Sequence, residues 1–184
     1  KVVINSAAVK NPSFLKKLVD IYGASTISVN IETAQLNGKY EVFTETGRVK
    51  SGIGLFDWVE QVQKLNVGEI IVTDIFSEGK NKGYNIDLFK KIRKNVDTQL
   101  VAHGGAGPKE NILEIFKESG VDAVSIASLF HYHYLKSNKS SELKGSNYFV
   151  HFLDDSEKRG LSILELKEYL KKNGVNVRLW KKNH

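Results

Sequence analysis

Val2-Val3-Ile4-Asn5-Ser6-Ala7 opens the chain, and a related stretch, Val124-Ser125-Ile126-Ala127-Ser128-Leu129, follows about two thirds of the way along. Each is a short β-branched run that breaks into small and hydroxyl residues, as at the junction of a strand with a helix. Such a junction leaves free backbone N–H groups at the helix N-terminus, and these groups bind anions. We therefore expect one phosphate site at Asn5 and Ser6, and a second at Ala127 and Ser128.

Three more strand-like runs lie between the two stretches, at residues 26–32, 69–73 and 99–102, and helix-like sequence follows each one. This alternation is typical of a parallel sheet wrapped by helices. The two phosphate sites are four strand–helix units apart, which is half of a (βα)₈ TIM barrel, so they would face each other across it. The sequence thus predicts an α/β fold with about five of the eight parallel strands of such a barrel.

The chain contains no methionine and begins inside a strand-like run, so we expect an N-terminally truncated piece of one barrel domain spanning residues 1–184. The dipeptide Asn37-Gly38 predicts a hairpin joining residues 34–36 to 40–44, as an inserted β-ribbon over one mouth of the barrel. Helices are expected after the strands, one of them opening at Pro12, with a mobile loop at residues 74–85.

The pattern changes after residue 130. Residues 132–160 form an inserted loop or edge segment, in which 136–141 reads as a polar surface loop and 148–153 could add an edge strand. A final helix over residues 162–172 is expected to bury Ile163, Leu166 and Leu170.

The composition is that of an ordinary globular protein, with 41% hydrophobic and 26% charged residues. Cysteine is absent, so disulfides are excluded and a cytoplasmic setting is expected. The formal net charge is +6, but the lysines are scattered among acidic residues, which favours a solvated surface over a nucleic-acid site. No run is long enough to span a membrane.

A glycine loop, Gly104-Gly105-Ala106-Gly107, stands directly between a strand and a helix. Glycine lets the backbone approach a phosphate closely, although a plain turn would have the same composition. The loop belongs to the strand next to Ser128, and neighbouring strand ends of this kind often hold phosphate in TIM barrels. We therefore assign Gly104 and Gly105 to the second phosphate site.

Glu32 is the expected catalytic acid or base, because it closes a strand at the end where TIM barrels carry their catalytic residues. The alternative is a structural role, in which Glu32 is an interior acid paired with a lysine. Asp74 is a weaker candidate at the next strand end, and His103 is a possible proton carrier. Glu78 and Lys80 could close over a substrate from the loop that follows Asp74.

Two further sets of residues complete the candidates. His131 and His133 flank Tyr132, but no third ligand is near in sequence, so we predict no metal site and no cofactor. Lys1 and Glu69 stand at the opposite ends of their strands and would pair at the other mouth of the barrel.

Taken together, the chain resembles the cyclase subunit of imidazole glycerol phosphate synthase, over its fourth to eighth strand–helix units and outside about residues 132–160. The matching stretches are Lys1–Ala8, Asn37–Thr44, Gly68–Thr73, Gly79 with Gly83-Tyr84, Gly104–Gly107, Ala127–His131 and Leu166–Leu179.

The resemblance implies a barrel that receives ammonia from a glutaminase subunit docked at its N-terminal face. Ammonia would react with a bisphosphorylated ribulosyl aminoimidazole carboxamide, giving imidazole glycerol phosphate and aminoimidazole carboxamide ribotide for histidine biosynthesis. By the same resemblance Gly79 joins the second phosphate site, and Lys1 with Glu69 belongs to the charged ring at the ammonia entry.

The chain departs from the family at its catalytic loops. One of the family's two catalytic aspartates aligns with Glu32, a longer carboxylate, and the other would precede Lys1. The family's Asp-x-Asp-Gly-Thr pattern reads Phe76-Ser77-Glu78-Gly79-Lys80 here. These changes leave two alternatives open: a paralogue delivering ammonia for sugar amidation in surface-polysaccharide biosynthesis, and a non-catalytic ammonia-channel scaffold.

Overall fold

Strands and helices alternate along the chain in the computed structural model, which describes residues 1–137 and 160–179. The strands are β1 (Val2–Ile4), β2 (Ile27–Leu36), β3 (Lys39–Thr44), β4 (Val49–Gly54), β5 (Glu69–Asp74), β6 (Gln99–His103) and β7 (Ala123–Ser125). The α-helices are α1 (Ser6–Lys10), α2 (Pro12–Tyr22), α3 (Leu55–Lys64), α4 (Ile86–Arg93), α5 (Lys109–Ser119), α6 (Ser128–Ser137) and α7 (Ile163–Lys172). A short 3₁₀ helix, η1 (Ala24–Thr26), leads into β2.

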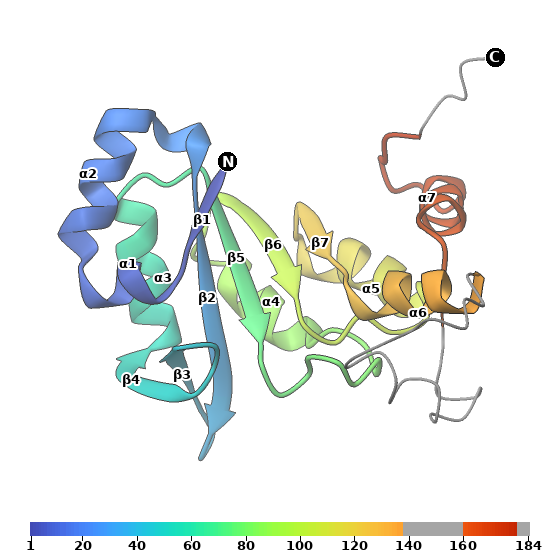
Figure 1. The fold of residues 1–184 in the computed structure, drawn as a ribbon, viewed down its shortest axis with the longest axis horizontal. Coiled ribbons are helices and arrows are strands. Elements are labelled where there is room, and N and C mark those ends of the chain that lie inside the picture. Colours follow the sequence, from blue (N-terminus) through green and yellow to red (C-terminus); the bar gives the residue numbers. More distant parts are fainter. Residues whose placement is uncertain (138–159, 180–184) are drawn as a thin grey trace.

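Within the described residues, the strands form one sheet in the order β4-β3-β2-β5-β6-β7, and β1 also pairs with β2. Strands β1, β2, β5, β6 and β7 are parallel, and Figure 1 shows them side by side. The predicted α/β fold with five parallel strands is therefore confirmed. The sheet is open rather than closed into a ring in this part of the chain.

One face of the sheet carries the hydrophobic core. Alternate residues of β2, Ile27, Val29 and Ile31, are almost fully buried, and their register partners Ile70 and Val72 on β5 are fully buried. These side chains belong to one cluster with apolar residues of the flanking helices, including Leu15, Trp58, Phe89, Ile112 and Ile115. Because side chains alternate along a strand, the intervening residues face the other side, where the polar candidates lie.

Local sequence explains where the helices begin and end. Asn11 accepts a hydrogen bond on Oδ1 from the Phe14 amide at 3.1 Å, and Pro12 follows as the first residue of α2. Ser162 and Glu165 form a complete capping box at the start of α7. Lys109 begins α5 directly after Pro108, so the glycine loop is held between β6 and a helix N-terminus.

The β-ribbon is part of the main sheet, and this corrects the expectation of a separate insertion on a loop. Strand β2 continues without a break to Leu36, and β3 folds back on it antiparallel after the Asn37-Gly38 turn. A third strand, β4, pairs with β3 and was not predicted. The turn between β3 and β4 returns to the carboxyl edge of the parallel strands, where it contacts Ser6 and Glu32.

The region after β7 also differs from expectation. Strand β7 ends at Ser125, and residues 128–137 form helix α6. Its start agrees with the strand–helix junction expected at Ser128, but residues 132–137 were expected to belong to an inserted loop or edge segment. The predicted edge strand at 148–153 lies outside the described residues, as do 138–147 and 154–159 of the expected insertion. Helix α7 buries Leu166 and Leu170 as expected, but Ile163 is 54% exposed, so its predicted burial is wrong.

Candidate functional site at the carboxyl edge of the sheet

Four polar side chains form a row across the carboxyl ends of the parallel strands. Glu32 on β2 is in register with Thr73 on β5, Thr73 with His103 on β6, and His103 with Ser125 on β7. Register partners in neighbouring parallel strands point to the same face of a sheet. The row therefore lies on the face opposite the helix-packed core, at the edge where α/β enzymes carry their chemistry.

Glu32 is held by the turn between β3 and β4. Its Oε2 accepts a hydrogen bond from the Gly47 amide at 3.0 Å. Three consecutive residues of this turn, Glu45, Thr46 and Gly47, have left-handed backbone with φ of 54°, 58° and 73°. Glu32 was expected to end its strand, but β2 runs on to Leu36. Glu32 is the last residue but one of the parallel ladder with β5, which ends at the pair of Thr33 and Asp74.

His103 is joined to its neighbours by a chain of hydrogen bonds. Its Nδ1 lies 3.1 Å from Thr73 Oγ1, and Thr73 Oγ1 donates to Asn30 Oδ1 at 2.9 Å. On the other side of the ring, Nε2 is 4.0 Å from Glu78 Oε1, on the loop after β5. Thr73 and Asn30 were not among the site candidates from the sequence.

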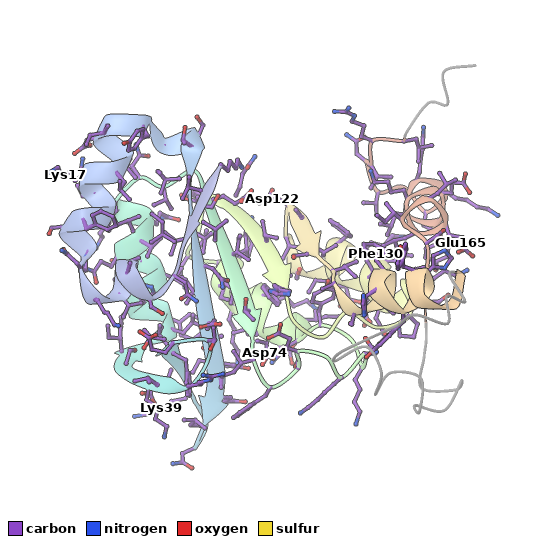
Figure 2. The ribbon with its side chains drawn as sticks, viewed as in Figure 1. Lys17, Lys39, Asp74, Asp122, Phe130 and Glu165 are labelled. Atoms are coloured by element: carbon purple, nitrogen blue, oxygen red, sulfur yellow. The ribbon has the colours of Figure 1, made fainter. Side chains whose placement is uncertain are left out.

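Asp74 does not belong to this row. It is in register with Thr33 and follows Thr73, so its side chain lies on the other face of the sheet, and it is only 5% exposed. Figure 2 shows it where β5 meets the following loop. Its carboxylate accepts hydrogen bonds from the Phe76 amide at 3.2 Å and from Ser77 Oγ at 2.9 Å. Asp74 therefore braces the loop, which is a structural role.

The first predicted phosphate site lies after β1. Asn5 precedes the short helix α1 and makes no side-chain cap, and its buried Oδ1 has no hydrogen-bond partner among the described residues. Ser6 Oγ accepts a hydrogen bond from the Glu45 amide at 2.9 Å. The Lys10 ammonium, by hydrogen bond and charge, holds the pKa of the Glu45 carboxyl below its usual value. The β3–β4 turn thus contacts both Ser6 and Glu32.

The glycine loop after β6 is packed tightly against the loop after β5. Gly104 and Gly105 have backbone φ angles of 87° and 101°, which residues other than glycine rarely adopt. A Cβ on Gly104 would lie 2.5 Å from the backbone oxygen of Asp74, and one on Gly105 would lie 2.4 Å from that of Gly83. The Gly83 amide also donates to the Gly105 carbonyl at 2.7 Å. Close backbone packing therefore explains both glycines, and any phosphate contact would be additional.

The second predicted phosphate site includes the start of α6. Ser128 is the first residue of this helix, and its Oγ donates a hydrogen bond to Asn81 Oδ1 at 3.0 Å. Ala127 precedes it, and its carbonyl accepts from the His131 amide at 3.0 Å. Gly79, on the same loop as Asn81, has a left-handed φ of 73° and open space where a Cβ would stand. Asn81 was not predicted as a partner of Ser128.

Ser6 and Ser128 lie at the same edge of the sheet, because each follows the carboxyl end of a parallel strand. Their strands, β1 and β7, stand at the two ends of the parallel series β1-β2-β5-β6-β7. The row from Glu32 to Ser125 lies between them. This arrangement places two candidate anion sites on either side of a set of groups that can carry protons.

Lys1 and Glu69 pair at the opposite edge, as expected. Lys1 Nζ is 2.9 Å from Glu69 Oε2, and Ser28 Oγ donates to Glu69 Oε1 at 2.9 Å. Burial alone would raise the pKa of the Glu69 carboxyl, but the hydrogen bonds from Lys1 and Ser28, with nearby positive charge, lower it below its ordinary value. In Figure 2, Asp122 marks this amino end of the parallel strands, opposite Asp74.

His131 and His133 both lie on helix α6. Residues two apart on a helix do not face each other, so these two side chains cannot bind one metal ion together.

Among residues 1–137 and 160–179, no helix is both long and apolar enough to cross a membrane.

Comparison with known proteins identifies the family of this chain and agrees with its fold. A family model described as Histidine biosynthesis protein matches residues 1–136. The chain is 36% identical over 179 residues to a protein of Thermotoga sp. strain RQ2 named imidazole glycerol phosphate synthase subunit HisF, covering 97% of this chain and 60% of that protein. Proteins of the same name from Pyrococcus furiosus and Clostridium botulinum strain Kyoto are 37% and 33% identical, over 97% of this chain and 61% of theirs.

The chain thus spans about 60% of the length of the curated relatives that it matches. The family match covers β1 to α6 except for the last residue of that helix, and therefore includes the whole carboxyl-edge row and both candidate phosphate sites. On this match, the chain belongs to the family of histidine biosynthesis proteins.

Proposed function

We propose that the protein is a cyclase subunit of imidazole glycerol phosphate synthase, and that residues 1–184 form part of one TIM-barrel domain. It would use ammonia to convert a bisphosphorylated ribulosyl aminoimidazole carboxamide into imidazole glycerol phosphate and aminoimidazole carboxamide ribotide. The observation that carries this proposal is the row of Glu32, Thr73, His103 and Ser125 between two candidate anion sites. The relatives reported above all bear the name of this subunit.

The two phosphates of the substrate would occupy the two ends of the carboxyl edge. One would bind at Asn5 and Ser6, where the Asn5 amide oxygen has no hydrogen-bond partner among the described residues and the amide N–H groups would donate to the anion. The other would bind at Ser128 and the backbone N–H groups of Ala127, Gly79, Gly104 and Gly105. Helix N-termini bind anions, and Ser128 begins α6, a helix of ten residues, which supports a phosphate at this position.

Glu32 would act as a general base or acid on the bound substrate. Its carboxylate is fixed by the Gly47 amide through Oε2, which leaves Oε1 free of any hydrogen bond among the described residues. Thr73, its register partner, links it along the same face to His103. Because the β3–β4 turn contacts both Ser6 and Glu32, phosphate binding at Ser6 would influence the position of Glu32.

Ammonia would come from a glutaminase subunit bound at the amino edge, beside Lys1 and Glu69. The ion pair between these residues, supported by Ser28, places a charged pair at that edge of the sheet. Ammonia would then travel along the polar face to the carboxyl edge. None of the relatives reported above is named for sugar amidation, so the histidine-pathway reaction is the function that the comparisons favour.

The direct test uses the protein expressed from its complete gene, with the bisphosphorylated substrate and excess ammonium chloride. Chromatography should detect imidazole glycerol phosphate and aminoimidazole carboxamide ribotide in equal amounts. Substrate binding without turnover would contradict the proposal and support the sugar-amidation paralogue or the scaffold.

A matched pair of variants tests the role of Glu32. Glu32→Gln keeps an acceptor for the Gly47 amide but cannot carry a proton, so turnover should fall about 100-fold or more. Glu41→Gln is the control, because Glu41 Oε1 accepts a hydrogen bond from the Gly52 amide at 3.1 Å away from the row. Equal, mild effects of the two changes would give Glu32 a structural role.

The ammonia entry is tested by comparing two nitrogen sources. Glu69→Gln should lower the turnover that depends on glutamine and the glutaminase subunit, while turnover with free ammonium stays within about twofold, since free ammonia also reaches the site from solvent. Loss of both activities in a folded variant would contradict this role for Glu69.

A further inference from the structure

The hydrogen bonds around His103 favour one tautomer of its neutral ring. Thr73 Oγ1 donates its single hydrogen to Asn30 Oδ1 at 2.9 Å. It then accepts at its contact with His103 Nδ1, 3.1 Å away, and this arrangement favours the neutral ring that is protonated on Nδ1. Thr73 is 2% exposed, which shields this link from water.

The other ring nitrogen is left with a free lone pair. His103 Nε2 has no hydrogen bond among the described residues, and its nearest charged partner is Glu78 Oε1 at 4.0 Å. The His103 side chain is 27% exposed, so Nε2 is accessible from the carboxyl edge. The Glu78 carboxylate therefore faces the nitrogen that would accept a proton.

We propose that His103 is a catalytic proton-transfer residue, acting through Nε2, while Thr73 and Asn30 are its positioning residues. This inference rests on the proposed function and adds a second proton carrier to Glu32. His103 stands in register between Thr73 and Ser125, in the strand next to β7. It also immediately precedes Gly104, so a substrate phosphate held at the glycine loop would bring the adjoining sugar carbons near Nε2.

The step assigned to His103 is the addition of ammonia to the substrate ketone. A carbon–nitrogen bond forms, the carbonyl π electrons move to oxygen, and the adduct carries a positive nitrogen and a negative oxygen. His103 Nε2 takes one proton from the nitrogen and becomes an imidazolium, which the Glu78 carboxylate faces. The imidazolium returns that proton to the oxygen, so the product is a neutral carbinolamine and His103 is again neutral.

Other ionisable groups at this edge have different partners. Glu32 is bound to the Gly47 amide two strands away, and Asp74 faces the opposite side of the sheet. Lys80 lies on the same loop as Glu78, and no contact between it and His103 is present in the described structure. From β7, the register partner of His103 is the neutral Ser125. Glu78 is thus the charged group that faces His103.

The kinetic test uses His103→Asn in the protein from its complete gene, assayed with ammonium chloride and the bisphosphorylated substrate. The amide nitrogen of Asn can still donate to Thr73, but the variant has no group at the Nε2 position. We expect kcat to fall about 100-fold, KM to change less than about threefold, and the limb of the pH–kcat profile that histidine supplies to disappear. A kcat within about threefold of the unmodified protein overturns the proposal.

Two further variants separate catalysis from structure. His131→Asn changes an exposed histidine on α6 and should leave kcat unchanged. His103→Ala should regain activity when imidazole is added, because free imidazole can supply the missing base. Failure of imidazole to restore His103→Ala, in a variant that is folded and binds substrate, assigns His103 a structural role and overturns the proposal.

Nitrogen-15 NMR of the histidine rings tests the geometry without any turnover. The neutral His103 ring should be in the Nδ1–H form, and Thr73→Val should allow the Nε2–H form that free histidine prefers. An Nε2–H ring in the unmodified protein overturns the proposal whatever the activity. An Nδ1–H ring in a protein that binds substrate without forming product contradicts the proposed function, and the proton-transfer role for His103 with it.

Discussion

Ser128 Oγ donates a hydrogen bond to Asn81 Oδ1 at 3.0 Å, which joins the first residue of α6 to the loop after β5. The hydroxyl that we assign to a substrate phosphate is therefore already engaged by the protein. An anion that binds at this helix N-terminus must compete with Asn81 for it. The loop after β5 and the second phosphate site are thus coupled directly.

This coupling predicts that Asn81→Gly strengthens anion binding. Asn81 has a left-handed φ of 53°, which glycine adopts without strain, and the change frees the Ser128 hydroxyl. A typical hydrogen bond contributes about 1 kcal/mol, so the Kd for the bisphosphorylated substrate should fall about fivefold in calorimetry. Ser128→Ala should weaken binding instead. Equal weakening by both changes would show that Asn81 helps to hold the ligand.

Alanine substitutions at the buried Gly104 and at the exposed Gly38 should differ greatly in their effect on stability. Gly104→Ala would place a Cβ 2.5 Å from the Asp74 carbonyl oxygen, so backbone must move. Gly38→Ala is the control, because Gly38 has a similar φ of 81° but open space around its Cβ position. We expect Gly38→Ala to lower the free energy of unfolding by about 1 kcal/mol and Gly104→Ala by about 3 kcal/mol. Urea unfolding of each protein gives both values, and similar losses would contradict the close packing of Gly104.

Removing the Asp74 carboxylate should destabilise the loop after β5 locally rather than unfold the whole protein. Asp74→Ala removes the acceptor for the Phe76 amide and Ser77 Oγ, so the loop after β5 should open more often. Trypsin should then cut faster at the exposed Lys80 and Lys82. Mass spectrometry of the fragments measures this. Asp87→Asn, at an exposed position in the first turn of α4, is the control, and its cleavage rate should stay close to that of the unmodified chain.

The strand–helix alternation could be predicted from the sequence because most of the parallel strands are short β-branched runs followed by a helix start. Strand β4 could not, since Val49-Lys50-Ser51-Gly52-Ile53-Gly54 has little strand propensity, and its conformation comes from pairing with β3. The extent of helix α6 beyond residue 131 was missed for a related reason. Its residues form no clear apolar stripe, so no helical periodicity marks it.

The candidate site, like the fold, could be predicted from the sequence only in part. Strand ends are visible in the sequence, so Glu32, Ser6, Ser128 and the glycine loop could all be named as candidates at one edge. The link from Asn30 through Thr73 to His103 could not, because the register between strands is set by packing. Asp74 was predicted as a weaker candidate at the same edge, but it is one residue beyond Thr73, and a shift of one residue along a strand moves a side chain to the opposite face.

Glu69 predicts a dependence of stability on pH. Its pKa is lower in the folded protein than in the unfolded chain, so the folded state binds fewer protons there and gains stability above the unfolded pKa. This gain is fully present at neutral pH and is lost as the pH falls from about 4.5 through the folded value. Glu69→Gln should therefore lower the free energy of unfolding by about 1 kcal/mol at pH 7 and by much less at pH 3.

Glu60→Gln is the matched control, because Lys64 also lowers the pKa of Glu60. This pair is exposed on α3, so its loss should have little effect on stability at either pH. Urea unfolding at the two pH values measures both variants, and an equal loss for Glu69→Gln at pH 7 and pH 3 would show that its charge does not stabilise the fold.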